Sequence, residues 1–145
     1  MPRSEHPKLK LLYLKDILES RSDADHILTA QMMIDLLAEK GIHAERKSIY
    51  SDMECLQQYG LDVIQLRGPG GGYYLASHEF ELPELKLLVD AVQSCKFLSE
   101  KKSLQLISKL ETLASTYEAK SLRRQVVVAG RVKTMNESIY YNVDR

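Results

Sequence analysis

A short run of glycine and proline at residues 68–72 constrains the fold of this chain more than any other feature of its sequence. Glycine disfavours both regular structures and proline donates no backbone hydrogen bond, so neither a helix nor a strand continues through this run. The segments on either side, 63–66 and 73–75, are rich in residues that favour strands. The pattern therefore predicts a β-hairpin with a flexible tip that carries Arg67.

The segment 44–59, which precedes the hairpin, is predicted to be a helix. Ile49, Met53 and Leu56 recur at positions i, i+4 and i+7, so we expect them to face a core. Arg46 and Lys47 lie in the first turn of this predicted helix, where a helix that enters the major groove of DNA makes its contacts. The polar residues on the other faces are Arg46, Lys47, Tyr50, Ser51 and Gln57.

Two amphipathic helices are predicted before this one, over 8–20 and 29–40. Thr29 is a favourable N-cap for the second of them, and Gly41 follows its last residue, as glycine often does. Two helices joined by a short turn that contains glycine are typical of a helix-turn-helix, and the following hairpin would make it a winged helix-turn-helix. The predicted apolar stripes comprise Leu9, Leu12, Tyr13, Ile17 and Leu18 in the first helix, and Met32, Met33, Leu36 and Leu37 in the second.

From residue 78 onward the chain is predicted to form a helical hairpin. A connector with Pro83, which suits the first turn of a helix, leads into helices over 84–98 and 100–114, the second capped by Ser99. These helices carry more apolar surface than one small wing can cover, so we expect a second copy of the hairpin to cover it and form a homodimer. The alternative is that the hairpin packs against its own winged helix.

The last segment of the chain has a different character. Residues 117–124 are compatible with a helix, and 125–129 and 130–134 with short strands that lack an evident partner. An unpaired apolar strand is prone to swapping between copies. We therefore expect a fold that is mainly α with a small β-hairpin, divided into a winged helix-turn-helix at 1–77, a dimerisation hairpin at 78–116 and a tail at 117–145.

Composition bears on other classes of protein. Lys and Arg number 20 and Asp and Glu number 20, a balance that does not favour nucleic acid as a partner. No apolar run approaches the ~20 residues of a membrane span and the N-terminus lacks the apolar core of a signal peptide, so we expect a cytoplasmic protein without a membrane partner.

Cys55 and Cys95 form no metal-binding or redox motif and are predicted to be small buried apolar residues. No nucleophile, base and orienting group can be combined, so we expect no enzyme and no catalytic, cofactor-binding or metal-binding residues.

Residues 45–56 and 70–75 together resemble the DeoR-type winged helix-turn-helix that begins bacterial WYL-domain transcriptional regulators. The family pattern reads approximately R-[RK]-T-I-x-R-D-[IL]-x-x-L, followed after a spacer by G-G-Y-x-L. Ser51 departs from this pattern, since the family often has arginine there, and one contact to DNA is expected to be absent. The matching positions are Ile49, Asp52, Leu56, Gly71, Gly72 and Tyr73, while Arg46 and Lys47 keep the basic pair and Ser48 replaces the threonine.

Similar proteins continue into a ligand-sensing WYL domain at about the point where this chain ends. The resemblance therefore implies the N-terminal part of a longer regulator, either a natural short form or a shortened chain, in which no effector ligand is expected. Asp52 is expected to pair with a neighbouring helix or basic side chain rather than with DNA, because phosphate repels a carboxylate.

We expect a sequence-specific transcriptional regulator that binds double-stranded DNA as a dimer, with the helix at 44–59 in the major groove. Arg67 would reach the DNA backbone or the adjacent minor groove, and the start of the helix at 29–40 would meet phosphate. The alternative is a protein-interaction module that uses the same surface, which the zero net charge favours. The predicted DNA-binding residues are Arg46, Lys47, Ser48, Tyr50, Ser51, Arg67, Thr29 and Gln31.

Overall fold

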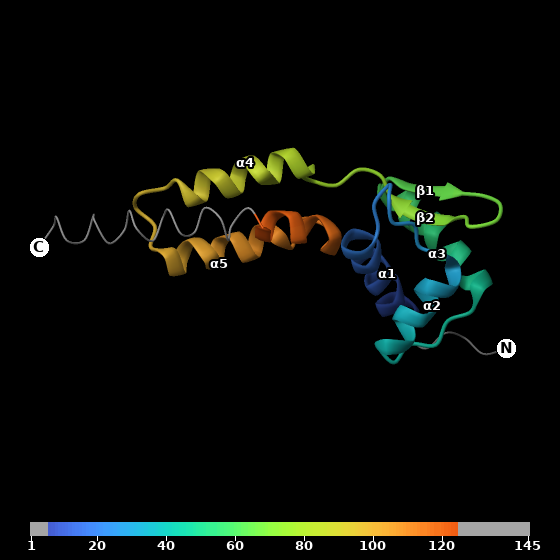
Figure 1. The fold of residues 1–145 in the computed structure, drawn as a ribbon. Coiled ribbons are helices and arrows are strands. Elements are labelled where there is room, and N and C mark those ends of the chain that lie inside the picture. Colours follow the sequence, from blue (N-terminus) through green and yellow to red (C-terminus); the bar gives the residue numbers. More distant parts are fainter. Residues whose placement is uncertain (1–5, 125–145) are drawn as a thin grey trace, which may run out of the picture. The chain divides into compact units, whose positions relative to one another are not determined.

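The computed structural model describes residues 6–124, and the chain divides into two compact units, Met1–His78 and Glu79–Arg145. Figure 1 shows helices in both units and one antiparallel two-stranded hairpin in the first unit. The expected fold class, mainly α with a small β-hairpin, is confirmed. The strands expected at 125–129 and 130–134 lie outside the described residues.

Three helices form most of the first unit: α1 (Pro7–Arg21), α2 (Ala30–Glu39) and α3 (Arg46–Tyr59). Thr29 caps α2, because its Oγ1 accepts a hydrogen bond from a backbone N–H of the first turn at 3.1 Å. Gly41 follows α2 with a φ of 77°, a left-handed conformation that glycine adopts without a steric penalty. The predicted start and end of α2 are therefore confirmed.

The hairpin pairs β1 (Val63–Leu66) with β2 (Gly72–Leu75), as the sequence predicts. Leu28, in the segment before α2, joins this hairpin, because the backbones of Leu28 and Tyr73 exchange two hydrogen bonds of 2.8 and 2.7 Å. Gly72 allows this close approach, since a Cβ atom at that position would lie 2.2 Å from the carbonyl oxygen of Leu28. A side chain there would push the hairpin away from the segment that precedes α2.

The core of the first unit collects apolar residues from α1, α2, α3 and the hairpin. Ile49, Met53 and Leu56 of α3 are buried, as their spacing predicts. The stripe predicted for α1 is partly wrong, because Leu9 and Leu12 are 42% and 60% exposed. The buried face of α1 includes Lys10, which pairs with Asp52 of α3, and an apolar pattern does not include a lysine. The residues of α1 that are buried are Lys10, Leu14, Ile17 and Leu18.

The second unit contains α4 (Leu82–Gln93) and α5 (Glu100–Glu111), and a further helical segment spans 116–124. Ser99 caps α5 as predicted, since its Oγ accepts a hydrogen bond from a backbone N–H of the first turn at 3.1 Å. Both helices end earlier than their apolar patterns predict, because those patterns run on into turns. Phe97, expected within the first of these helices, lies instead in the turn and is 92% exposed. The buried core of this unit comprises Leu85, Val89, Ile107, Ala114 and Leu122.

The prediction that both cysteines are buried is wrong. Cys55 is exposed on α3, Cys95 is half-buried after α4, and both are free thiols. Cys55 directly precedes the buried Leu56, so the rotation of α3 decides its exposure and the apolar character of cysteine does not. Within residues 6–124, no helix combines the length and the apolar character needed to cross a membrane.

Candidate nucleic-acid interface

The exposed side of α3 carries most of the side chains predicted to meet DNA. Arg46, Lys47, Tyr50 and Ser51 are all exposed, whereas the opposite side of the helix is buried. Glu45 precedes α3 in an extended conformation, and its side chain forms no capping hydrogen bond. The first N–H groups of α3 are therefore open to water or to an anion, and the helix dipole favours negative charge at this end.

The hairpin packs beside α3. The ring centroids of Tyr50 on α3 and Tyr73 on β2 lie 6.3 Å apart, with the rings tilted by 42°. Gln57 of α3 donates a hydrogen bond from Nε2 to the carbonyl oxygen of Val63 on β1 at 2.8 Å. Because both strands contact the helix, α3 and the hairpin form one continuous surface.

Tyr73 is a protonated phenol at the base of this surface. Burial raises its pKa above the ordinary tyrosine value, Tyr50 and Glu54 add to the rise, and Arg67 opposes it. Tyr73 therefore belongs to the packed base of the surface and not to its exposed part.

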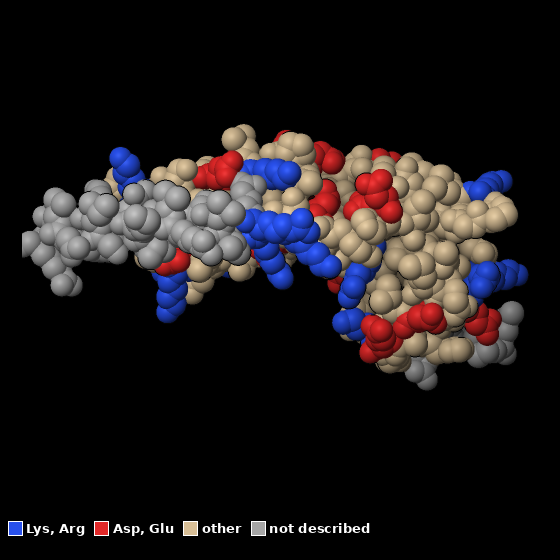
Figure 2. Space-filling model, in the orientation of Figure 1, with Lys and Arg blue, Asp and Glu red and all other residues tan. Residues whose placement is uncertain are grey.

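The predicted cations of this surface are Arg46, Lys47 and Arg67, and all three are exposed. Among the described residues they form no ion pair with an acidic side chain. Figure 2 shows basic side chains at one end of the first unit in two places, over the hairpin loop and over the start of α3. Acidic side chains also occur on this face of the unit, so the positive charge is local to those two places.

Lys10 lies behind this surface and was not predicted from the sequence. It is 2% exposed, its Nζ lies 2.7 Å from Oδ2 of Asp52, and it donates a hydrogen bond to Oγ of Ser48. Oδ2 of Asp52 accepts no hydrogen bond from the described residues, so its contact with Lys10 is an ion pair alone. The prediction that Asp52 pairs with a basic side chain is confirmed, and Ser48, predicted to meet DNA, is half-buried with an internal partner.

One sequence signal could have identified Lys10. Lys10, Leu14 and Ile17 occupy positions i, i+4 and i+7, so the lysine shares a helical stripe with buried apolar residues. A cation on such a stripe needs a partner of opposite charge, because burying an unpaired charge is expensive. Asp52 lies next to the buried Met53 on α3, so it is an acidic residue that can supply this partner.

The two residues predicted to meet phosphate at the start of α2 also have internal partners. Thr29 uses its hydroxyl oxygen to cap the helix, and the exposed Gln31 donates from Nε2 to Oδ1 of Asp35 at 2.9 Å. Asp35 places a carboxylate one turn from Gln31, which disfavours phosphate there. The side chains of both positions are therefore already engaged within the first unit.

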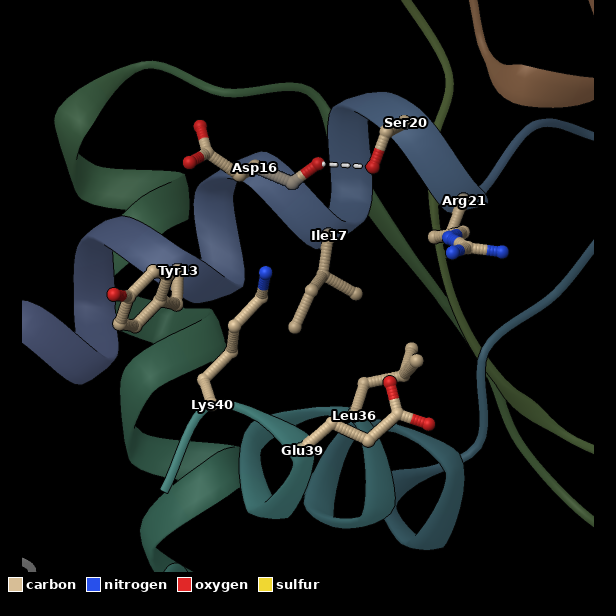
Figure 3. A pocket seen from close by; sticks show the side chains of 8 residues that line it. All are labelled: Tyr13, Asp16, Ile17, Ser20, Arg21, Leu36, Glu39 and Lys40. Carbon is tan, nitrogen blue, oxygen red and sulfur yellow. Dashed lines mark hydrogen bonds between the residues drawn. The ribbon is translucent and has the colours of Figure 1, made fainter. Parts of the chain in front are cut away.

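A separate pocket of about 220 Å³ lies between α1 and α2. Figure 3 shows Ile17 and Leu36 at its centre and charged side chains around them. Nζ of Lys40 lies 5.9 Å from the ring centroid of Tyr13, a cation–π distance. Acidic and basic residues both line the pocket, and it includes none of the predicted DNA-binding residues: its lining is Tyr13, Asp16, Ile17, Ser20, Arg21, Leu36, Glu39 and Lys40.

The surface of α3 and the hairpin combines exposed cations, hydroxyl groups and the start of a helix without a side-chain cap, which suits a polyanion. Comparison of the chain with protein-family models, curated proteins and solved structures found no match.

Proposed function

We propose that this protein is a sequence-specific transcriptional regulator that binds double-stranded DNA through α3 and the hairpin. The observation that carries the proposal is the exposed surface on which Arg46, Lys47 and Arg67 have no acidic partner among the described residues. A helix reads the major groove when one face packs on a rigid support and its first turns present donors to base edges. In α3, the buried apolar face supplies the first condition and the exposed polar residues supply the second.

Within this proposal the side chains have different roles. Arg46 and Lys47 reach base edges or flanking phosphates, and Tyr50 and Ser51 add hydroxyl donors along the same helix. Arg67 reaches the DNA backbone or the adjacent minor groove from the tip of the hairpin. The contributions of Ser48, Thr29 and Gln31 are secondary, because each already has an internal partner.

The second unit supports a homodimer within the same proposal. Leu87 on α4 is 70% exposed, and Leu104 and Leu106 on α5 are exposed as well. Exposed apolar side chains on a small helical hairpin gain free energy when a partner covers them. A second copy related by a two-fold axis would present two recognition helices to two half-sites, which gives a dimer more affinity and specificity than one helix provides.

The resemblance of the α3 and hairpin sequences to DeoR-type regulators of the WYL family agrees with this proposal. A regulator of that kind acts on DNA in the cytoplasm. No catalytic residue, cofactor or effector is part of the proposed mechanism.

Selection of bound sequences from a random duplex pool, followed by mobility-shift titration, tests the proposal. The winning sequence is expected to be palindromic, with half-sites set by the dimer. The variant Arg46→Ala/Lys47→Ala is expected to bind it at least about tenfold more weakly, because each lost contact is worth about 1–3 kcal/mol if it reads a base. Loss of a phosphate contact would also reduce the salt slope by about one unit.

A matched control removes the same charge from another exposed helix. Lys101→Ala/Lys102→Ala changes two exposed lysines of α5 and is expected to leave binding nearly unchanged. Equal losses in the two double variants would show that overall charge, and not α3, determines binding. No measurable affinity of the wild type for random duplex at low salt would instead favour the protein-interaction module.

A further inference from the structure

The ion pair between Lys10 and Asp52 is not explained by stability. Removing two charges from water has an unfavourable free energy that largely offsets their mutual attraction, so well-packed apolar residues of similar size stabilise a core at least as well. Lys10 is 2% exposed and the Asp52 side chain 19%, so this balance applies to the pair. The geometry of the contact provides a better explanation.

Lys10 contacts two successive turns of α3. Ser48 and Asp52 are four residues apart, so they lie on one line along the helix, and one ammonium group meets both. The apolar residues on the buried face of α3 make non-directional contacts, which tolerate small rotations of the helix. The hydrogen bond to Ser48 is directional and the ion pair with Asp52 acts over a short range, so together they fix how far α3 is rotated against α1.

Arg46 and Tyr50 lie on a second line along α3, two positions before Ser48 and Asp52. With 3.6 residues per turn, the two lines are about 200° apart around the helix axis. Arg46 and Tyr50 are thus nearly opposite the side chains that Lys10 holds. Any rotation of α3 that released Lys10 would redirect Arg46 and Tyr50 as well.

We propose that Lys10 is a positioning residue for DNA recognition. By holding Ser48 and Asp52, it fixes the rotation of α3 and thereby the bases that Arg46 and Tyr50 can read. The inference rests on the proposed function, but the fixed rotation of α3 can be measured without DNA.

The test replaces the pair with apolar residues of similar size, Lys10→Met together with Asp52→Leu. Its melting temperature is expected to equal or exceed that of the wild type. The ratio of its affinity for the selected operator to its affinity for random duplex is expected to fall at least about tenfold, the size of one misplaced base contact. The salt dependence of random-duplex binding stays the same, because no phosphate contact is removed.

The matched control removes an ion pair within α1, the helix that contains Lys10. Neither member of this pair is a residue of α3. Lys15 and Glu19 of α1 are 2.7 Å apart and partly exposed. The variant Lys15→Met/Glu19→Leu is expected to keep the operator ratio of the wild type. If Lys10→Met/Asp52→Leu also kept that ratio, Lys10 would not be a positioning residue.

Amide hydrogen exchange supplies the readout without DNA. In Lys10→Met/Asp52→Leu, the amides of residues 50–56 are expected to exchange faster than in the wild type, while those of α2 do not change. If the wild type bound no DNA, the proposed function would be wrong, and unchanged exchange in α3 would then overturn this inference separately. If the double variant failed to fold, Asp52→Asn, which removes the charge and keeps the shape, would be measured in the same two ways, and wild-type values in both would overturn the inference.

Discussion

The two units of the chain bury their apolar side chains to different degrees. The first unit has one continuous core, to which α1, α2, α3 and the hairpin all contribute. The second unit closes a smaller core around residues such as Leu85 and Ile107 and leaves Leu87 and Phe97 exposed. The surface formed by α3 and the hairpin therefore rests on one continuous core, whereas the second unit has a smaller core; both units leave apolar side chains such as Leu12 and Leu87 exposed.

Breaking the ion pair between Lys10 and Asp52 should have the largest effect on the free energy of unfolding, and this effect should be confined to the first unit. Lys10→Met leaves the Asp52 carboxylate inside the unit without its cation, and it is expected to lower the free energy of unfolding by about 3–5 kcal/mol. Lys15→Met, in the partly exposed pair of α1, is expected to lower it by less than about 1 kcal/mol. Urea denaturation at several protein concentrations measures both losses. Similar values for the two variants would show that the first unit does not depend on Lys10.

A charge on the exposed leucine of α4 should affect assembly through the second unit. Leu87→Glu is expected to raise the dimer dissociation constant at least about tenfold, or about 1.4 kcal/mol, because burying a charge in an apolar interface is unfavourable. Leu12→Glu is the control, since Leu12 is similarly exposed but belongs to the first unit. Sedimentation analysis of both variants shows which unit contributes to the dimer. Dissociation caused equally by Leu12→Glu would mean that the first unit contributes to the dimer.

The helix caps provide the smallest and most closely matched comparison. Thr29→Ala in the first unit and Ser99→Ala in the second each remove a hydroxyl that accepts a backbone hydrogen bond at 3.1 Å. Each change is expected to lower the free energy of unfolding by about 1 kcal/mol. Thermal melts over a range of protein concentrations should show that only the transition of the second unit depends on concentration. A first-unit transition with the same dependence would contradict the division of roles.

Local signals in the sequence predicted much of the fold. Thr29 and Gly41 mark the ends of α2 through a cap and a left-handed turn, and both effects act within a few residues. The spacing of Ile49, Met53 and Leu56 gave the buried face of α3 correctly, because apolar residues dominate that face. The exposure of Arg46 and Lys47 follows from it.

Features that depend on distant parts of the chain were not predictable in the same way. The burial of Lys10 depends on Asp52 of another helix, so the stripe that Lys10 shares with Leu14 and Ile17 indicates that burial only together with the sequence of α3. Leu28 joins the hairpin through one bridge, which is too short to produce an alternating pattern. The internal partners of Ser48 and Gln31 likewise depend on how side chains meet in the folded unit.

The glycine at position 72 helps to fix the distance between the hairpin and the start of α2. Its close contact with Leu28, together with the two backbone hydrogen bonds at Tyr73, links the hairpin to the residue next to Thr29. The span from the hairpin to the start of α2 can change only if those hydrogen bonds break. On a double helix, such a fixed span would select sites by the width of the groove as well as by their bases.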